Sequence, residues 1–143
     1  MSDRFSDLTS AQRSCPSRKR VLLVDEQCRE LSCLTETLHE HGCEVHSCSC
    51  FADGLRQIES EFFDFIVVCQ GGPQFEGKQV LERAIEIDRR TPILVVTRCL
   101  DMKCYLDAMQ LGALDYVERP LVPEEIARLV ETHPRPHAAG ATV

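Results

Sequence analysis

The chain contains no long apolar segment. None of its 143 residues fall in a run approaching the 20 or so apolar residues that a membrane span needs. Residues 1–20 carry scattered charges and lack the apolar centre of a secretory signal. We therefore expect a protein that does not span a membrane and that resides in the cytoplasm.

Positive charge is also scarce. Sixteen Lys and Arg residues stand against 23 Asp and Glu residues, which gives a formal net charge of -7. Duplex nucleic acid requires a broad basic face, so direct DNA binding is not expected. The remaining composition, 43% hydrophobic and 27% charged, is that of an ordinary globular protein. A chain of this length is expected to form one domain.

Cysteine, by contrast, is abundant, with nine residues. Cytosolic thiols are kept reduced, so we expect most of them to be small core residues rather than disulfide partners. A dense group of potential soft ligands suggests a less favoured alternative, a Zn²⁺ or Cu site. This group lacks paired Cys-x-x-Cys spacing, and strand alternation separates its members onto opposite faces. Its members are His39, His41, Cys43, His46, Cys48 and Cys50.

Apolar periodicity predicts five strands that alternate with five helices. The predicted strands cover 21–24, 43–47, 63–68, 92–96 and 115–117, and the predicted helices cover 27–41, 51–62, 80–90, 100–110 and 123–131. This alternation predicts a doubly wound α/β sandwich, a flavodoxin-like (βα)5 fold whose five-stranded parallel sheet has the order 2-1-3-4-5. Residues 20–132 would form the domain, with a flexible tail at 1–19 and a tail or linker start at 133–143.

The carboxyl ends of four strands should meet at one crevice, where ligands bind in open parallel sheets. The third strand ends at Cys69, and glycines and a proline follow it. A cysteine therefore occupies a position at which function is expected. The residues gathered at this edge are Asp25, Glu26, Cys69, Thr97, Arg98, Glu118, Arg119 and Pro120.

Four motifs occur in a characteristic order. They are Val-Leu-Leu-Val-Asp-Glu at 21–26, Phe-Asp-Phe-Ile-Val-Val at 63–68 followed by Pro73 and Gly77, Thr-Pro-Ile-Leu-Val-Val-Thr at 91–97, and Gly-Ala-Leu-Asp-Tyr-Val-Glu-Arg-Pro at 112–120. From Arg20 to about Thr132 the chain thereby resembles the receiver domain of two-component response regulators. In that family an aspartate that ends the third strand accepts a phosphoryl group from a histidine kinase. Mg²⁺, an acidic pair, a Thr or Ser, and a Lys before a cis-proline assist this transfer.

The resemblance assigns roles to several residues. Asp25 and Glu26 match the acidic pair that holds Mg²⁺, and Thr97 matches the hydroxyl residue that contacts the phosphoryl group. Tyr116 matches the aromatic residue whose rotamer reports the switch, and Pro120 matches the proline after the lysine.

Three positions depart from the family pattern. Cys69 replaces the phosphoacceptor Asp, Arg119 replaces the Lys, and Arg98 stands where a small residue is usual. A thiol removes one hard ligand and one charge, so Mg²⁺ binding at Asp25 and Glu26 should be vestigial at most. We therefore expect a degenerate receiver, not an enzyme, that acts by binding without phosphorylation of residue 69.

Two further expectations concern partners and Cys69. The resemblance implies a protein partner, such as a histidine kinase or another signalling protein, bound to the face of the fourth helix, fifth strand and fifth helix. That face also allows a homodimer, and its residues are Lys103, Asp107, Gln110, Tyr116, Arg128 and Glu131. Alternatively, Cys69 is a redox sensor whose thiol pKa is lowered by Arg98 and Arg119. A third interpretation is that Cys69 is only a small buried residue that preserves the shape of the site.

Overall fold

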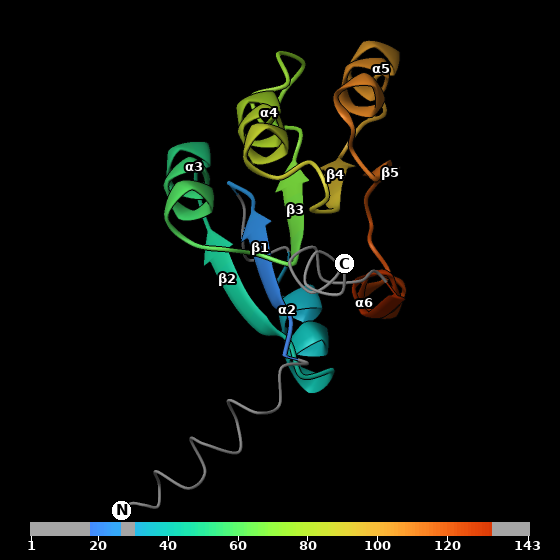
Figure 1. The fold of residues 1–143 in the computed structure, drawn as a ribbon. Coiled ribbons are helices and arrows are strands. Elements are labelled where there is room, and N and C mark those ends of the chain that lie inside the picture. Colours follow the sequence, from blue (N-terminus) through green and yellow to red (C-terminus); the bar gives the residue numbers. More distant parts are fainter. Residues whose placement is uncertain (1–17, 27–30, 133–143) are drawn as a thin grey trace, which may run out of the picture.

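A computed structural model of the chain describes residues 18–26 and 31–132 (Figure 1). Within these ranges, five strands alternate with five helices, as predicted. The elements are β1 (Arg20–Val24), α2 (Ser32–Glu40), β2 (Glu44–Cys48), α3 (Phe51–Ser60), β3 (Phe65–Cys69), α4 (Lys78–Ile87), β4 (Ile93–Thr97), α5 (Met102–Leu111), β5 (Asp115–Glu118) and α6 (Pro123–Thr132). Residues 1–17 of the expected tail at 1–19, the expected tail at 133–143 and the predicted helix residues 27–30 lie outside the described residues.

The five strands form one parallel sheet in the order β2-β1-β3-β4-β5, which confirms the predicted fold. Helices α2 and α6 cover one face, and α3, α4 and α5 cover the other (Figure 1). Side chains along β1 point alternately to the two faces of the sheet. Val21 and Leu23 pack toward α2 and α6, and Leu22 and Val24 pack toward the helices on the opposite face. Strands β3 and β4 are buried at every position. Burial on both faces explains the continuous apolar runs in the sequence.

Several predicted boundaries are wrong by a few residues. Strand β3 begins at Phe65 instead of residue 63, because the buried Asp64 carboxylate accepts a hydrogen bond from the Arg20 backbone N–H at 2.8 Å. Helix α4 ends at Ile87, so the two arginines at 89 and 90 do not lie in its last turn. Helix α5 begins after Asp101, whose carboxylate caps it by accepting from the Cys104 N–H at 3.1 Å.

The loop from Gln70 to Gly77 folds back onto the end of β3. The Gly77 N–H donates to the Gln70 carbonyl oxygen at 3.0 Å. A Cβ atom at Gly77 would stand 2.0 Å from the Cys69 carbonyl oxygen, a distance that excludes any side chain. The glycine therefore lets this loop close over the strand that carries Cys69 into the candidate site.

Candidate functional site

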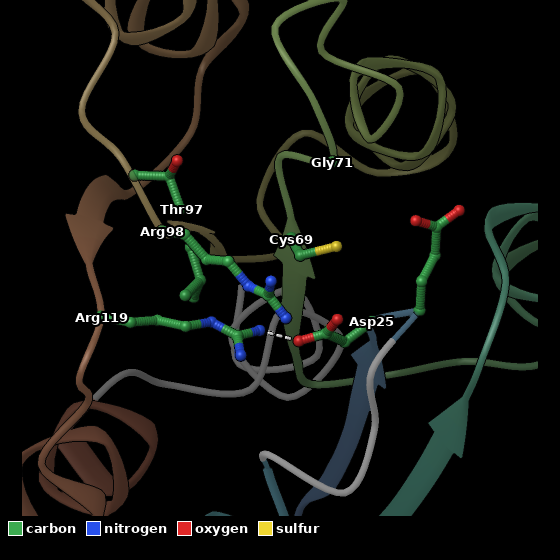
Figure 2. A pocket seen from close by; sticks show the side chains of 8 residues that line it. Asp25, Cys69, Gly71, Thr97, Arg98 and Arg119 are labelled. Atoms are coloured by element: carbon green, nitrogen blue, oxygen red, sulfur yellow. Dashed lines mark ion pairs between the residues drawn. The ribbon is translucent and has the colours of Figure 1, made fainter.

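The carboxyl ends of β1, β3, β4 and β5 enclose a pocket of about 130 Å³ (Figure 2). The fold thus brings together six of the residues that the sequence placed at this edge. The lining residues are Asp25, Glu26, Cys69, Gly71, Val96, Thr97, Arg98 and Arg119. Pro120 follows through a cis peptide bond and lines neighbouring hollows instead of this pocket.

Cys69 lies at the centre of the pocket and is 9% exposed. Burial raises the pKa of its thiol, the backbone N–H groups of Glu26 and Gly71 partly offset this rise, and Arg98 offsets it further. The negative charge of Glu26 also raises the pKa. The net shift is opposite in sign to the one that the redox-sensor hypothesis expects. A protonated, neutral thiol therefore occupies this position at neutral pH.

Asp25 and Arg119 form an ion pair across the pocket (Figure 2). Only 4% of the Asp25 side chain and 13% of the Arg119 side chain are exposed. Burial lowers the pKa of Arg119, but a guanidinium remains protonated throughout the physiological range. The charge of the buried Asp25 carboxylate is thus balanced by a side chain of the same domain.

The two residues at the end of β4 point in different directions (Figure 2). The Thr97 hydroxyl donates to the Cys99 carbonyl oxygen at 2.9 Å and accepts from the Cys99 N–H at 3.2 Å, so it is engaged with its own loop. The Arg98 side chain reaches across the pocket toward Cys69 and Asp25. Two guanidinium groups and two carboxylates therefore line one small pocket.

Tyr116 is buried next to this site rather than exposed on the predicted partner face. Its side chain is held by Gln70, whose Oε1 accepts from the Tyr116 hydroxyl, and the Asp101 N–H donates to that hydroxyl at 3.2 Å. Gln70 is 4% exposed and also donates from Nε2 to the Gly72 carbonyl oxygen at 3.0 Å. Sequence reasoning missed Gln70, although a polar residue immediately after a fully apolar strand was a signal.

The other predicted partner-face residues are dispersed. Lys103, Gln110 and Arg128 are exposed, whereas Asp107 is half-buried and lies 3.8 Å from the Lys78 ammonium. The Glu131 carboxylate accepts from the His41 ring at 2.6 Å.

The sequence prediction missed a group of exposed apolar residues on α5 and just before it. They form what we call the α5 patch, which consists of Leu100, Met102, Tyr105 and Leu106 with exposures of 60%, 70%, 39% and 47%. Three of its members, with Asp101 and Tyr116, line a hollow of about 450 Å³. The available signal was a second apolar row at 102, 105 and 106, distinct from the core-facing row at 104, 108 and 111.

The group of His and Cys residues between 39 and 50 is separated by the fold. Cys43 packs in the core layer beneath α2 and α6, and Cys48 packs in the opposite layer. His46 contacts Glu44 at 2.7 Å. Among residues 18–26 and 31–132, no three His, Cys, Asp or Glu side chains are placed to hold a metal ion, and every cysteine is free. Four of the seven described cysteines are buried, in line with the expected core role.

None of the helices within the described part of the chain is both long and apolar enough to cross a bilayer.

Comparison with known proteins identifies the family of the domain. A family model for the response regulator receiver domain matches residues 21–131.

Relatives and solved structures agree with this match. The chain is 31% identical over 125 residues to the transcriptional activator protein IrlR of Burkholderia pseudomallei, covering 87% of this chain and 54% of that protein. It is 27% identical over 112 residues to the transcriptional regulatory protein ZraR of Salmonella typhimurium, covering 78% of this chain and 25% of that protein. The chain thus spans between a quarter and about half of these relatives.

A crystal structure of a CheY-like response regulator receiver domain protein from Methanospirillum hungatei superposes with a TM-score of 0.74. That likeness has 26% sequence identity and covers 80% of this chain and 91% of that chain. The strand order, the pocket at the strand ends and the matched residues 21–131 lead to the same assignment. The chain therefore belongs to the family of response regulator receiver domains.

Proposed function

We propose that this protein is a receiver domain that signals by binding other proteins, without phosphoryl transfer to residue 69. The neutral, buried thiol of Cys69 is the observation that supports this proposal most strongly. Phosphoryl transfer to a receiver needs a nucleophilic carboxylate whose developing charge is neutralised by cations. A thiol with a raised pKa supplies neither the charge nor an adequate nucleophile at neutral pH.

The residues at the positions of the family lysine and hydroxyl residue are also engaged in other contacts. Arg119, at the position of the family lysine, is paired with Asp25. Thr97, at the position of the hydroxyl residue, exchanges hydrogen bonds with Cys99. Positioning and charge neutralisation supply most of the catalysis in phosphoryl transfer, so this arrangement disfavours the reaction even with a strong donor.

The phosphoryl-transfer part of the proposal can be tested with acetyl phosphate and Mg²⁺. We expect intact-mass spectrometry of the wild-type protein to show no added phosphoryl group that depends on Mg²⁺. The matched controls are Cys69→Asp and Cys69→Asp with Arg119→Lys, of which the double variant should recover modification at residue 69. Stable, Mg²⁺-dependent phosphate on wild-type Cys69 would contradict the proposal.

The binding part of the proposal assigns the α5 patch as the contact surface for a protein partner, such as a histidine kinase or another signalling protein. Leu100, Met102 and Leu106 expose apolar area that water solvates poorly, and a protein partner would bury it. Lys103, next to Met102 on α5, supplies an exposed charged group beside these apolar residues. Tyr116 is left out as a direct contact, because its ring is buried.

A matched pair of exposed apolar residues tests this surface. Leu106 on α5 and Ile87 at the end of α4 are both 47% exposed. We expect Leu106→Ser to weaken capture of a partner by the immobilised protein at least about tenfold, which corresponds to loss of one well-buried anchor. Ile87→Ser should leave capture unchanged. Equal binding by both variants and the wild type would exclude the α5 patch as the contact surface.

A further inference from the structure

We propose that the Arg119 guanidinium takes the place of the divalent cation in this pocket, so that the formal charges of the pocket residues balance without Mg²⁺. The proposal concerns the same pocket as the proposed function and rests on it for its meaning in signalling. It would make this receiver independent of Mg²⁺ as well as of a phosphoryl donor.

The groups at the centre of the pocket do not suit Mg²⁺. This ion demands hard oxygen ligands in near-octahedral geometry. At the central position, Cys69 offers a neutral, soft sulfur atom. The Asp25 carboxylate is already paired with a guanidinium, so a metal ion would have to displace Arg119 to use it.

The position of Arg119 follows from the fold. Its backbone N–H donates to the Thr97 carbonyl oxygen at 2.8 Å, which fixes the residue at the end of β5. From there the side chain crosses the pocket to Asp25 at the end of β1 (Figure 2). Because residue 69 is a neutral cysteine, Asp25 is the buried carboxylate that the Arg119 side chain meets in the pocket. The long planar guanidinium can reach it and form a charge-assisted contact.

Formal charge favours the same conclusion. In the receiver pattern, three carboxylates and one ammonium line the pocket and leave an excess of two negative charges, which a divalent cation balances. Here Asp25 and Glu26 are opposed by Arg98 and Arg119, so the charges already balance. Adding a divalent cation would create an excess of two positive charges next to the buried ion pair of Asp25 and Arg119. Such an excess is costly where the dielectric constant is low.

The role of Arg119 can be tested through stability. Arg119→Met keeps much of the apolar stem but removes the charge, so the buried Asp25 carboxylate loses its ion pair with residue 119. We expect the thermal midpoint of the wild-type protein to stay constant on addition of about 10 mM MgCl₂. We expect Arg119→Met to start from a lower midpoint and to gain about 3 to 8 °C under the same conditions, because Mg²⁺ can now bind Asp25.

Two controls separate the outcomes. The double variant Asp25→Asn with Arg119→Met should show no gain from Mg²⁺, because the carboxylate that attracts the ion is gone. The proposal is overturned if the midpoint of Arg119→Met does not respond to Mg²⁺, or if its response equals that of the wild type.

Should Arg119→Met not fold, calorimetric titration of the wild type with Mg²⁺ decides the question. Saturable binding with a Kd below about 1 mM would overturn the proposal, and the absence of such binding would support it. No phosphoryl donor is present in these experiments, so this proposal and the proposed function can fail separately.

Discussion

At residue 69, a neutral side chain stands at the centre of the pocket, and burial limits its reactivity. Burial raises the pKa of the Cys69 thiol, so its thiolate fraction at pH 7 is lower than that of an ordinary cysteine. Cys33 and Cys99 are exposed and serve as internal references. We expect Cys69 to react with iodoacetamide at least about tenfold more slowly than these two, as measured by peptide mass spectrometry.

The same measurement discriminates between sensing and packing. In urea the three thiols should react at similar rates, which would show that the folded structure protects Cys69. Preferential modification of Cys69 in the folded protein, by iodoacetamide or by mild peroxide, would revive the redox-sensor alternative. Slow modification favours the interpretation that Cys69 preserves the shape of the site.

The Gln70 side chain holds the buried ring of Tyr116. Gln70 is 4% exposed and its Oε1 accepts from the Tyr116 hydroxyl, so Gln70→Leu would leave that buried hydroxyl without this partner. We expect a loss of about 1 to 3 kcal/mol in the free energy of unfolding and a larger exposure of Tyr116. The chain has two tyrosines and no tryptophan, so Tyr105→Phe isolates the fluorescence of Tyr116.

Quenching by acrylamide in this background then reports the position of the ring. Gln70→Leu should increase quenching of Tyr116, and Gln79→Leu on the exposed side of α4 should not. If Gln70→Leu left quenching unchanged, the hydrogen bond to Gln70 would not determine where the Tyr116 ring lies.

At the scale of elements, Gly77 joins the loop after β3 to the start of α4. A methyl group there would stand 2.0 Å from the Cys69 carbonyl oxygen, whereas at Gly72 its nearest contact would be an ordinary 3.6 Å. We expect Gly77→Ala to lower the free energy of unfolding by at least about 2 to 3 kcal/mol, because β3 or the loop must shift. Gly72→Ala should change it by less than about 0.5 kcal/mol. Urea unfolding checks both, and equal effects would contradict the close-contact argument.

Helices α2 and α6 are joined by a titratable contact. The His41 ring contacts the carboxylates of Glu131 at 2.6 Å and Glu124 at 3.1 Å, and the Lys19 ammonium donates to the Val130 carbonyl oxygen at 2.5 Å nearby. These carboxylates raise the pKa of His41 above its ordinary value of 6.5. The contact therefore stabilises the fold fully below pH 6.5, and its contribution is lost as the pH rises through the higher folded-state pKa.

NMR titration of the His41 ring checks this prediction directly. We expect a pKa above 6.5 in the wild type and a lower one in Glu131→Gln, because the strongest neighbouring carboxylate is removed. His39 is exposed on the same helix and offers a reference resonance. A pKa that Glu131→Gln leaves unchanged would show that this contact is not formed in solution.

Sequence patterns predicted the buried strands better than the ends of elements. Continuous β-branched runs marked β1, β3 and β4 because both faces of those strands are covered. The start of β3 was misplaced because Phe63 and Asp64 are buried without being part of the strand. Burial and strand formation give the same apolar signal, and only the backbone hydrogen bonds separate them.

For the whole molecule, topology predicted which residues meet but not how they pair. Parallel strands in the order 2-1-3-4-5 necessarily bring Asp25, Cys69 and Arg119 to one edge, so the pocket followed from the sequence. The ion pair of Asp25 with Arg119 and the contact of Gln70 with Tyr116 depend on side-chain reach and rotamer. Residue spacing carries no information on either.

The stability of the entire domain should fall at alkaline pH. Burial raises the pKa of Cys43, Cys69 and Cys104 above the ordinary value of 9.0. The unfolded chain therefore releases these protons first, so the stabilising contribution is complete below about pH 9 and is lost as the pH rises through the folded-state values. We expect the urea midpoint to decrease steadily from pH 8.5 to about pH 10.5. Replacing Cys43 and Cys104 by Ala should make this decrease shallower, whereas replacing the exposed Cys33 should not. A midpoint that rises over this range, or a slope that is the same in all three proteins, would show that the buried thiols do not set the alkaline limit of the fold.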